Sequence, residues 1–438
     1  MLNWIWLGLV VAAVILGGFT GQLDAVTKAA FKSCETAVVT IAIPFIGLIA
    51  LWLGVMRLAE KAGLVEILAR ALRPLMRRLF PDVPPEHPAM GSMLMNMAAN
   101  MLGLGNAATP LGLRAMQDLE TLNPRPGVAS NAMCTFLAIN TSSIQLVPAS
   151  TVAFMAAAGA TNPAAIIGTA FLATVCSTVV GITSVKFLEK LPGYRLPPVP
   201  EGERKAAVEK TDDTPAISSA PPLEPWAYPV LVVFFGLFGW FAVTAVTKAA
   251  PATAGGYVTA VVQAISLLAV PFLLSFFPLF AALKRIPVYE EFVEGAKEGF
   301  NVAIRIIPYL IAILVAVGMF RAAGGIEMIS RAIGPALAAV GFPVELLPLV
   351  LMRPLSGGGA SGLFNELIQV GGPAGGPDSL ISKMAGSIMG STETTFYVIA
   401  VYFGSVAIRR TRPAVPAGLL ADIAGVIASI VICRLVFS

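Results

Sequence analysis

Polar side chains gather in a few short stretches of this otherwise apolar sequence, and the first of these is 95–110. It holds Asn96, Asn100, Asn106 and Thr109 among glycines and a proline, which interrupt helices. If the stretch lies in a membrane, its unwound backbone must be satisfied by protein or by a water-lined cavity. The side chains then indicate a binding site for a polar substrate. They could instead form hydrogen bonds between helices that pack through small residues.

A glycine-rich run at 356–362 is the second stretch, and it contains Ser356 and Ser361. Its exposed amide groups, at the start of a following helix, would favour an anionic or strongly polar group. Asn365 and Glu366 could contact that group or could face water at the end of a hairpin. The glycines could also serve only close packing. No Gly-Lys-Ser/Thr ending follows, so the run is not a P-loop.

Two longer apolar segments carry polar side chains in their interiors. The first set is Asn140, Thr141, Ser142, Ser143 and Gln145, and the second is Ser387, Ser391, Thr392, Glu393, Thr394 and Thr395. Such a succession cannot face lipid on every side. Each set therefore predicts an interior surface and a local break in a membrane helix.

Glu393 has the most specific expectation, because an ionisable group at membrane depth is costly and usually functional. It could hydrogen-bond a substrate, take part in proton coupling or bind a cation. We predict no cofactor beyond a coupling Na⁺ or H⁺. The structural alternative is a Glu393 that pairs with a buried arginine or caps a broken helix. Asp422, in the last apolar segment, could likewise pair with a neighbouring helix.

The composition identifies lipid as the main solvent of these segments. Of the 438 residues, 57% are hydrophobic and 12% are charged, and the mean hydropathy is +0.82. Soluble domains carry about 25% charged residues. Apolar runs of about 20 residues, enough to cross a bilayer, recur along the chain. We therefore predict an all-α polytopic membrane protein with about nine full spans.

The expected spans and hairpins follow from the apolar runs and their interruptions. The spans are 3–20, 37–56, 130–156, 163–186, 226–247, 255–280, 303–320, 378–403 and 414–436. Two glycine-broken segments, 88–122 and 344–370, are expected to be re-entrant helical hairpins, which enter and leave on one side. The stretches 58–79 and 321–340 have the spacing of interfacial helices.

The two halves of the chain resemble each other, which indicates an internal duplication. The recurring pairs are Pro44 and Pro308, Gly54 and Gly318, and Arg57 and Arg321. The connector after Arg57 is rich in basic residues, whereas its counterpart 321–340 holds only Arg321 and Arg331. Equivalent connectors of the two halves thus lie on opposite sides of the membrane. This distribution of basic residues predicts inverted-topology repeats with a cytoplasmic N-terminus.

This layout predicts four parts and excludes several classes of function. The parts are a first repeat at 1–190, a cytoplasmic linker at 191–225, a linking transmembrane helix at 226–250 and a second repeat at 251–438. A net charge of +4 from basic loops does not indicate nucleic-acid binding. The single histidine, His87, and four scattered cysteines give no metal site, and no nucleophile–base motif indicates an enzyme.

At these residues the chain resembles the spore maturation proteins A and B, fused. Residues 1–195 resemble protein A, notably at 95–107 and Asn123-Pro124, and residues 270–438 resemble protein B, notably at 353–360 and 390–396. Both belong to the nucleoside-recognition or gate-domain group, which is similar in layout to concentrative nucleoside transporters. The resemblance implies that each repeat is a re-entrant hairpin followed by a broken helix. It also implies a substrate between hairpin tips and breaks.

The leading hypothesis is a transporter of a small polar metabolite, in the plasma membrane of a bacterium. We expect the substrate to be nucleoside-like or a small carboxylate. We expect an ion or proton gradient to drive its transport. The alternative is a non-transporting component of envelope or spore maturation. For the leading hypothesis, the expected partners are the small-molecule substrate and the lipid bilayer. The oligomeric state stays open, and a homo-oligomer is possible. The expected substrate-binding residues are Asn100, Asn106, Thr109, Asn140, Thr141, Ser142, Gln145, Ser356, Ser361, Asn365, Ser391, Thr392, Glu393 and Thr394.

Overall fold

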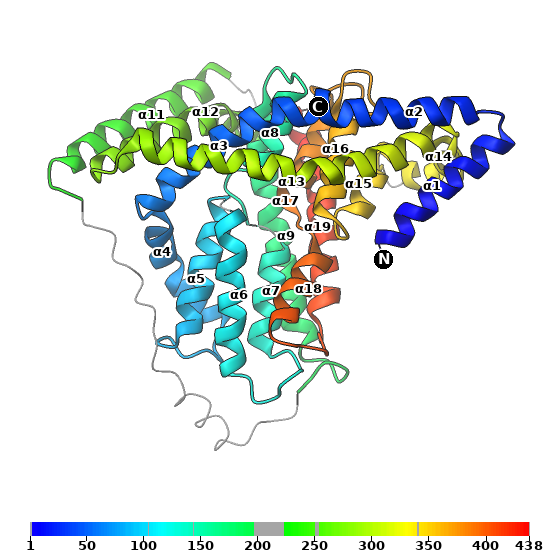
Figure 1. Cartoon of the computed structure of the whole chain (residues 1–438). Coiled ribbons are helices and arrows are strands. Elements are labelled where there is room, and N and C mark those ends of the chain that lie inside the picture. The colour runs from blue at the N-terminus through cyan, green and yellow to red at the C-terminus, as the bar shows by residue number, and fades with distance from the viewer. Residues whose placement is uncertain are drawn as a thin grey trace.

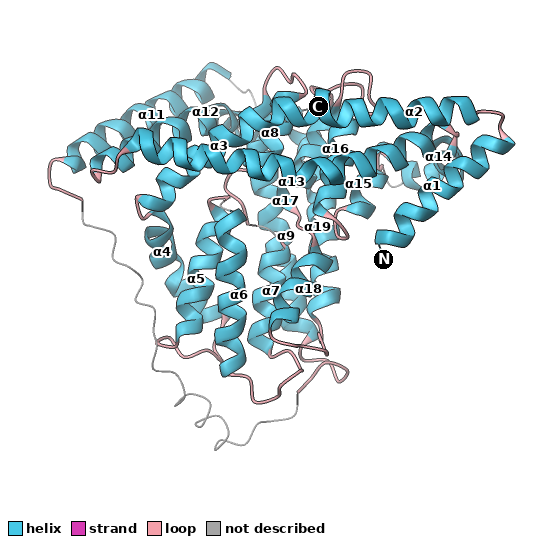
Figure 2. Cartoon of the chain, in the orientation of Figure 1, coloured by secondary structure: helices cyan, strands magenta, loops and turns pink. Residues whose placement is uncertain are grey.

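The computed structural model describes residues 2–103, 105–142, 144–196, 223–249, 254–339 and 341–437 (Figure 1). These residues are helical apart from loops and one isolated bridge between Val128 and Arg410 (Figure 2). Most of the predicted linker 191–225 lies outside them. The all-α prediction is confirmed for this part of the chain.

The helices of the first part of the chain end with a long helix, α9. They are α1 (Leu2–Phe19), α2 (Leu23–Glu35), the π-helix η1 (Thr36–Ala42), α3 (Ile43–Lys61), α4 (Leu64–Leu79), α5 (Pro88–Met101), α6 (Gly105–Thr121), α7 (Asn131–Thr141), α8 (Ala149–Ala157), the 3₁₀ turn η2 (Pro163–Ala165) and α9 (Ile166–Leu188).

The second part begins with α11 and ends with another long helix, α19. Its elements are α11 (Ala227–Ala249), α12 (Ala254–Leu283), α13 (Val288–Ala322), α14 (Gly325–Ala339), the 3₁₀ turn η3 (Val344–Leu346), α15 (Leu347–Met352), α16 (Gly357–Ile368), α17 (Leu380–Ser391), α18 (Thr395–Ser405) and α19 (Ala414–Phe437).

Four helices in the described residues are long and apolar enough to cross a membrane. They cover Pro163–Leu188, Ala227–Lys248, Ala260–Leu283 and Ala414–Phe437. Each coincides with a predicted span, and the chain is therefore a multi-pass membrane protein. The segments 130–156 and 378–403 are each divided into two helices. The full set of nine spans stays a prediction.

A long antiparallel helix pair runs across the view in Figure 1. It is formed by α2, η1 and α3 on one side and α13 on the other. A Cβ on Gly54 would lie 2.7 Å from the Phe292 ring and 2.8 Å from the Phe292 carbonyl, and one on Gly318 would meet the Ser33 hydroxyl. Glycine is thus required at position 54, because a larger residue there would force the helices apart, whereas at position 318 only the Ser33 hydroxyl has to turn away.

Arg57 and Arg321 lie at opposite ends of this pair. Arg57 pairs with Glu291, at the start of α13, at 2.7 Å. Arg321, in the last turn of α13, pairs with Glu366 of α16 at 2.7 Å. The charged first turns of α13 extend the helix well beyond the apolar segment predicted at 303–320. They are stabilised there by Arg57.

The helices α9 and α19 lie against each other along small residues. A Cβ on Gly181 would be 3.2 Å from the Cβ of Ala421, and the Ser177 hydroxyl donates to the Ala421 carbonyl at 2.9 Å. Both helices also contact α7 and α17. They therefore form the support on which the broken helices rest.

A loop contact gives a testable dependence on pH. Asp378 accepts hydrogen bonds from the Thr161 amide at 3.0 Å and from its hydroxyl at 2.8 Å. The Thr161 hydroxyl bond is the main cause that holds the pKa of Asp378 below its usual value. A depressed pKa in the folded state means that the contact is stabilising above the ordinary aspartate pKa and is lost as the pH falls through the folded value.

We expect the hydrogen-exchange protection factor of the Thr161 amide to fall as the pH is lowered through the acidic range. In Asp378→Asn the amide should be less protected and its protection independent of pH. Replacing the exposed Asp24 with asparagine should leave the profile of the parent protein. The same acid-induced fall in Asp378→Asn would contradict the assignment.

Candidate functional site

At the end of both broken helices, polar side chains donate to carbonyls of the last turns. After α7, the side chains of Asn140, Thr141 and Ser142 donate to the carbonyls of residues 136, 138 and 139 at 2.9, 3.0 and 2.9 Å. The Ala138 carbonyl also accepts from the Ser142 amide at 3.2 Å, so these side chains add to the backbone hydrogen bonds of the last turns. Pro148 then precedes α8. We call the described residues of this segment, 142 and 144–148, break 1.

Break 2 is the segment Thr392–Thr394, between α17 and α18. The Thr392 hydroxyl donates to the Ile388 carbonyl at 2.7 Å, and the Glu393 carboxylate accepts from the Thr394 amide at 3.2 Å. Both breaks lie where the polar runs predict them. The prediction of local unwinding is confirmed for both helices.

Each break is attached to the turn of a helical hairpin through the backbone. Hairpin 1 is α5 and α6, and its Met101 carbonyl accepts from the Leu146 amide at 2.9 Å. Hairpin 2 is η3 and α15 with α16, and its Pro354 carbonyl accepts from the Phe396 amide at 3.0 Å. The Ser356 hydroxyl caps α16 by accepting from the Gly359 amide at 3.1 Å.

The two breaks also touch each other. A Cβ on Gly390, just before break 2, would lie 2.9 Å from Pro148 at the end of break 1. A Cβ on Gly418 of α19 would lie 2.8 Å from Thr395 and 3.3 Å from Thr141. Residues from both parts of the chain therefore meet at one polar centre.

The first side of this centre is a network of three asparagines and a tyrosine. Asn100 donates to Asn140 at 2.9 Å, and Asn96 donates to the Ala108 carbonyl at 2.7 Å. Tyr402, from α18, accepts from Asn96 and donates to Asn140, both at 3.4 Å. We call these four polar side chains the amide network. All of its groups are neutral donors and acceptors.

The second side is organised by Arg353, which is buried at the turn of hairpin 2. Its guanidinium donates to the Met389 carbonyl at 3.1 Å, the Thr392 hydroxyl at 3.3 Å and the Thr392 carbonyl. It lies 3.8 Å from the Glu393 carboxylate. Arg353 thus satisfies the end of α17 and neutralises the acidic residue of break 2.

Hydroxyl groups on α9 and α19 complete the support of the breaks. Thr174 of α9 donates to the Ser142 carbonyl at 2.9 Å, and Ser429 of α19 lies 3.0 Å from the Ser391 hydroxyl. The Thr395 hydroxyl donates to the Asp422 carboxylate of α19 at 2.6 Å. Side-chain hydrogen bonds from α9 and α19 therefore support the segments at both breaks.

Most of the predicted site residues lie around this centre. They are Asn100, Asn140, Thr141, Ser142, Ser356, Ser391, Thr392, Glu393 and Thr394. Thr109, Gln145 and Ser361 are half-buried. The side chain of Asn106 lies outside the described part of the structure. Their binding roles stay predictions.

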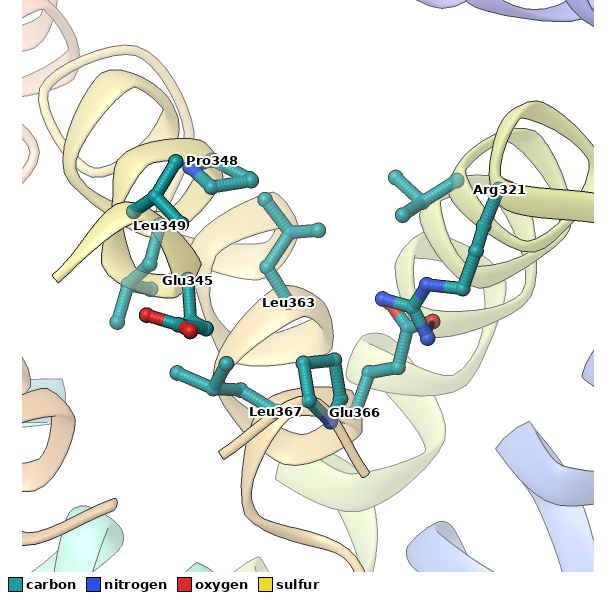
Figure 3. Close-up of a pocket in the computed structure, with 10 residues that line it drawn as sticks. Arg321, Glu345, Pro348, Leu349, Leu363, Glu366 and Leu367 are labelled. Atoms are coloured by element: carbon teal, nitrogen blue, oxygen red, sulfur yellow. Dashed lines mark ion pairs between the residues drawn. The ribbon is translucent and has the colours of Figure 1, made fainter. Parts of the chain in front are cut away.

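Asn365 and Glu366 are engaged further along α16. Asn365 is buried and accepts from Gln369, the residue that follows the end of α16, at 2.7 Å. Glu366 and Arg321 point toward each other and together line one side of a cavity of about 140 Å³, with Glu345 on its other side (Figure 3). Both expected roles of Glu366, contact with a bound group and exposure to water at a hairpin end, stay predictions.

Two residues of the centre carry no distinctive sequence signal. Tyr402 stands in an apolar run that reads as ordinary membrane helix. Arg353 reads as a boundary residue before the glycine-rich turn. Only the contact between hairpin 2 and break 2 gives Arg353 its three acceptors.

Comparisons with known proteins agree with this organisation. The family model of Gate, described as nucleoside recognition, matches residues 42–160 and 303–409. Spore maturation protein B of Bacillus subtilis (strain 168) is 45% identical over 177 residues, which are 40% of this chain and 97% of that protein. Spore maturation protein A of the same organism is 44% identical over 179 residues, which are 41% of this chain and 91% of that protein.

A solved structure gives a weaker similarity. The YdaH transporter of Alcanivorax borkumensis aligns over 99% of this chain and 96% of its own, with 14% identity and a TM-score of 0.43. That score is too low to support a conclusion about fold or function.

The family match includes both hairpins and both breaks. The two spore maturation proteins are each matched over nearly their whole length. The chain therefore belongs to the Gate family of nucleoside-recognition domains, as a fusion of a part similar to spore maturation protein A with a part similar to spore maturation protein B.

Proposed function

We propose that this protein is a membrane transporter of a small polar metabolite, which binds between the hairpin turns and the two breaks. The observation that carries the proposal is the polar centre, where two broken helices touch and expose amide, hydroxyl and charged groups to each other. Unwound backbone at membrane depth is tolerated where it lines a binding site or an aqueous path. Helix packing alone needs no break in either helix.

The proposed topology is a pair of inverted repeats with about nine spans and a cytoplasmic N-terminus. The recurring order of elements supports it. A long helix, a shorter helix, a hairpin, a broken helix and a final helix occur first in 43–188 and again in 288–437. The long helices, α3 and α13, run antiparallel, as equivalent elements of inverted repeats should.

The two sides of the centre suggest what the substrate carries. The amide network offers paired donors and acceptors of the kind that recognise a nucleobase edge or another planar polar group. Arg353 offers a cation suited to a carboxylate, once Glu393 gives way. A nucleoside-like molecule or a small carboxylate therefore fits best. If the substrate replaces Glu393 as the partner of Arg353, binding of the substrate changes the surroundings of the Glu393 carboxylate. Glu393 would then be the coupling residue.

A non-transporting role in envelope or spore maturation is the second candidate. It is favoured by the names of the two Bacillus relatives, spore maturation proteins A and B. In that role the polar centre would only hold the two parts of the chain together.

Reconstituted protein separates the two functions. Proteoliposomes should take up or exchange a member of a labelled panel of nucleosides and small carboxylates, with a proton or sodium gradient imposed. Glu393→Gln should abolish gradient-driven accumulation while the protein stays folded. Thr183→Ala, at an exposed hydroxyl on α9, is the matched control and should transport normally. Absence of flux across the whole panel would favour the second candidate, and normal transport by Glu393→Gln would remove Glu393 from coupling.

A further inference from the structure

A second carboxyl group lies beside break 2, within the apolar helix α19. Asp422 is 5% exposed, and its Oδ2 atom accepts from the Thr395 hydroxyl at 2.6 Å. Its Oδ1 atom is also buried and has no hydrogen-bond partner among the described residues. Buried carboxylate oxygens are normally paired, because an unpaired charge in an apolar interior is strongly unfavourable. The geometry of Asp422 is therefore unsuited to a permanent negative charge.

The charges around break 2 lead to the same conclusion. Arg353 and Glu393 are the charged groups that act electrostatically on Asp422. They are already within 3.8 Å of each other, so the positive charge of Arg353 is matched by Glu393. An ionised Asp422 would add an unmatched negative charge to this buried group. A neutral Asp422 leaves the cluster balanced.

The other helices packed on α19 bring no compensating charge to Asp422. Of these, α7, α12 and α18 contain no charged residue in their described sequences. On α17, Lys383 lies over the Phe437 ring, at the far end of α19. On α9, Lys186 pairs with Glu189. The α18 tyrosines are an exposed Tyr397 and the Tyr402 of the amide network.

Asp422 is also placed to transmit a change in its charge to break 2. Glycines one turn away on either side let break 2 approach α19: a Cβ on Gly418 would be 2.8 Å from Thr395, and one on Gly425 would be 2.9 Å from Thr392. The hydroxyl that bonds to Asp422 belongs to Thr395, the first residue of α18. The contact therefore joins α19 directly to the start of the second half of the broken helix.

We propose that Asp422 is a proton-binding site that is occupied in this conformation and whose deprotonation releases break 2. Loss of the proton would leave two carboxylates, Glu393 and Asp422, beside the single guanidinium of Arg353. Competition for Arg353 would weaken its bonds to the end of α17 and free the break. The proposal rests on the proposed transport function for its purpose, because it makes the proton the coupling ion.

Infrared spectroscopy of the purified full-length protein tests the proton directly and needs no substrate. At neutral pH the protein should show the C=O band of a protonated carboxyl group, and ¹³C labelling of aspartate should shift it. Asp422→Asn should lose the whole band. The control is Asp118→Asn, at a buried aspartate that pairs with Arg114 at 3.1 Å and should keep the band.

Several results would overturn the proposal. They are a band that does not shift with labelled aspartate, a band that persists in Asp422→Asn, and a band that Na⁺ removes at constant pH, since that would mark a sodium site. If Asp422→Asn does not fold, the isotope shift in the parent protein still decides the matter. A protein without solute flux that shows the band would refute transport and leave the proton site in place.

Discussion

Replacing Arg353 with methionine is expected to destabilise the folded protein by about 1–3 kcal/mol, the usual cost of leaving buried hydrogen-bond acceptors without a donor. Methionine fills similar space but has no donor. The Met389 and Thr392 carbonyls at the end of α17 would then lose Arg353, and the Glu393 carboxylate would lose the guanidinium 3.8 Å away. Thermal unfolding in detergent should show a large fall of the midpoint.

Two further variants separate charge from shape at this site. Adding Glu393→Gln to Arg353→Met should recover part of the loss, because the carboxylate whose charge Arg353 balances is then replaced by a neutral amide. The exposed Arg331 of α14 is the matched control, and its replacement with methionine should change stability by about 0.5 kcal/mol or less. Equal effects at positions 331 and 353 would contradict the role given to Arg353.

Alanine at position 112 is expected to lower stability by about 1–3 kcal/mol, the range found for overpacked cores. Gly112 faces the amide network from α6, and a Cβ there would overlap the Tyr402 hydroxyl and lie 2.9 Å from the Asn96 side-chain amide nitrogen. The tyrosine cannot easily move aside, because its ring is buried and stacked on Phe136, with 6.1 Å between ring centroids. The thermal midpoint in detergent measures the loss.

Gly91 of α5 provides the matched control, since a Cβ there would meet nothing within 4 Å. Gly91→Ala should be neutral or stabilising by up to about 1 kcal/mol, the helix-propensity gain of alanine over glycine. In a Tyr402→Ala background, Gly112→Ala should have a much smaller effect, because the clashing ring is gone. Additive losses in the double variant would show that Gly112 does not contact Tyr402 in solution.

The sequence predicts the positions of the breaks well because their cause is local. The runs 140–145 and 391–395 place hydroxyls and amides where a helix must end, and these side chains do bond to the last-turn carbonyls. The positions of the hairpins can also be predicted from local sequence, because glycines and prolines interrupt the segments 88–122 and 344–370. Such features need no knowledge of distant residues.

The partners within the site depend on tertiary contacts and could not be predicted in this way. Glu393 was expected to couple ions or to pair with an arginine. Its partner, Arg353, is supplied by a hairpin that precedes it in the chain. Tyr402 looked like any aromatic residue of an apolar helix, and only its approach to Asn96 and Asn140 gives it a role. The length of α13 was missed because its charged first turns are stabilised by Arg57.

The amide network has a consequence for how the molecule is made. Its asparagines come from the part similar to spore maturation protein A, and its tyrosine comes from the part similar to protein B. Neither part alone would bring these buried groups together. Synthesis as one polypeptide supplies the two parts in equal numbers and tethers them at high effective concentration, so that assembly does not depend on an encounter between separate molecules in the bilayer.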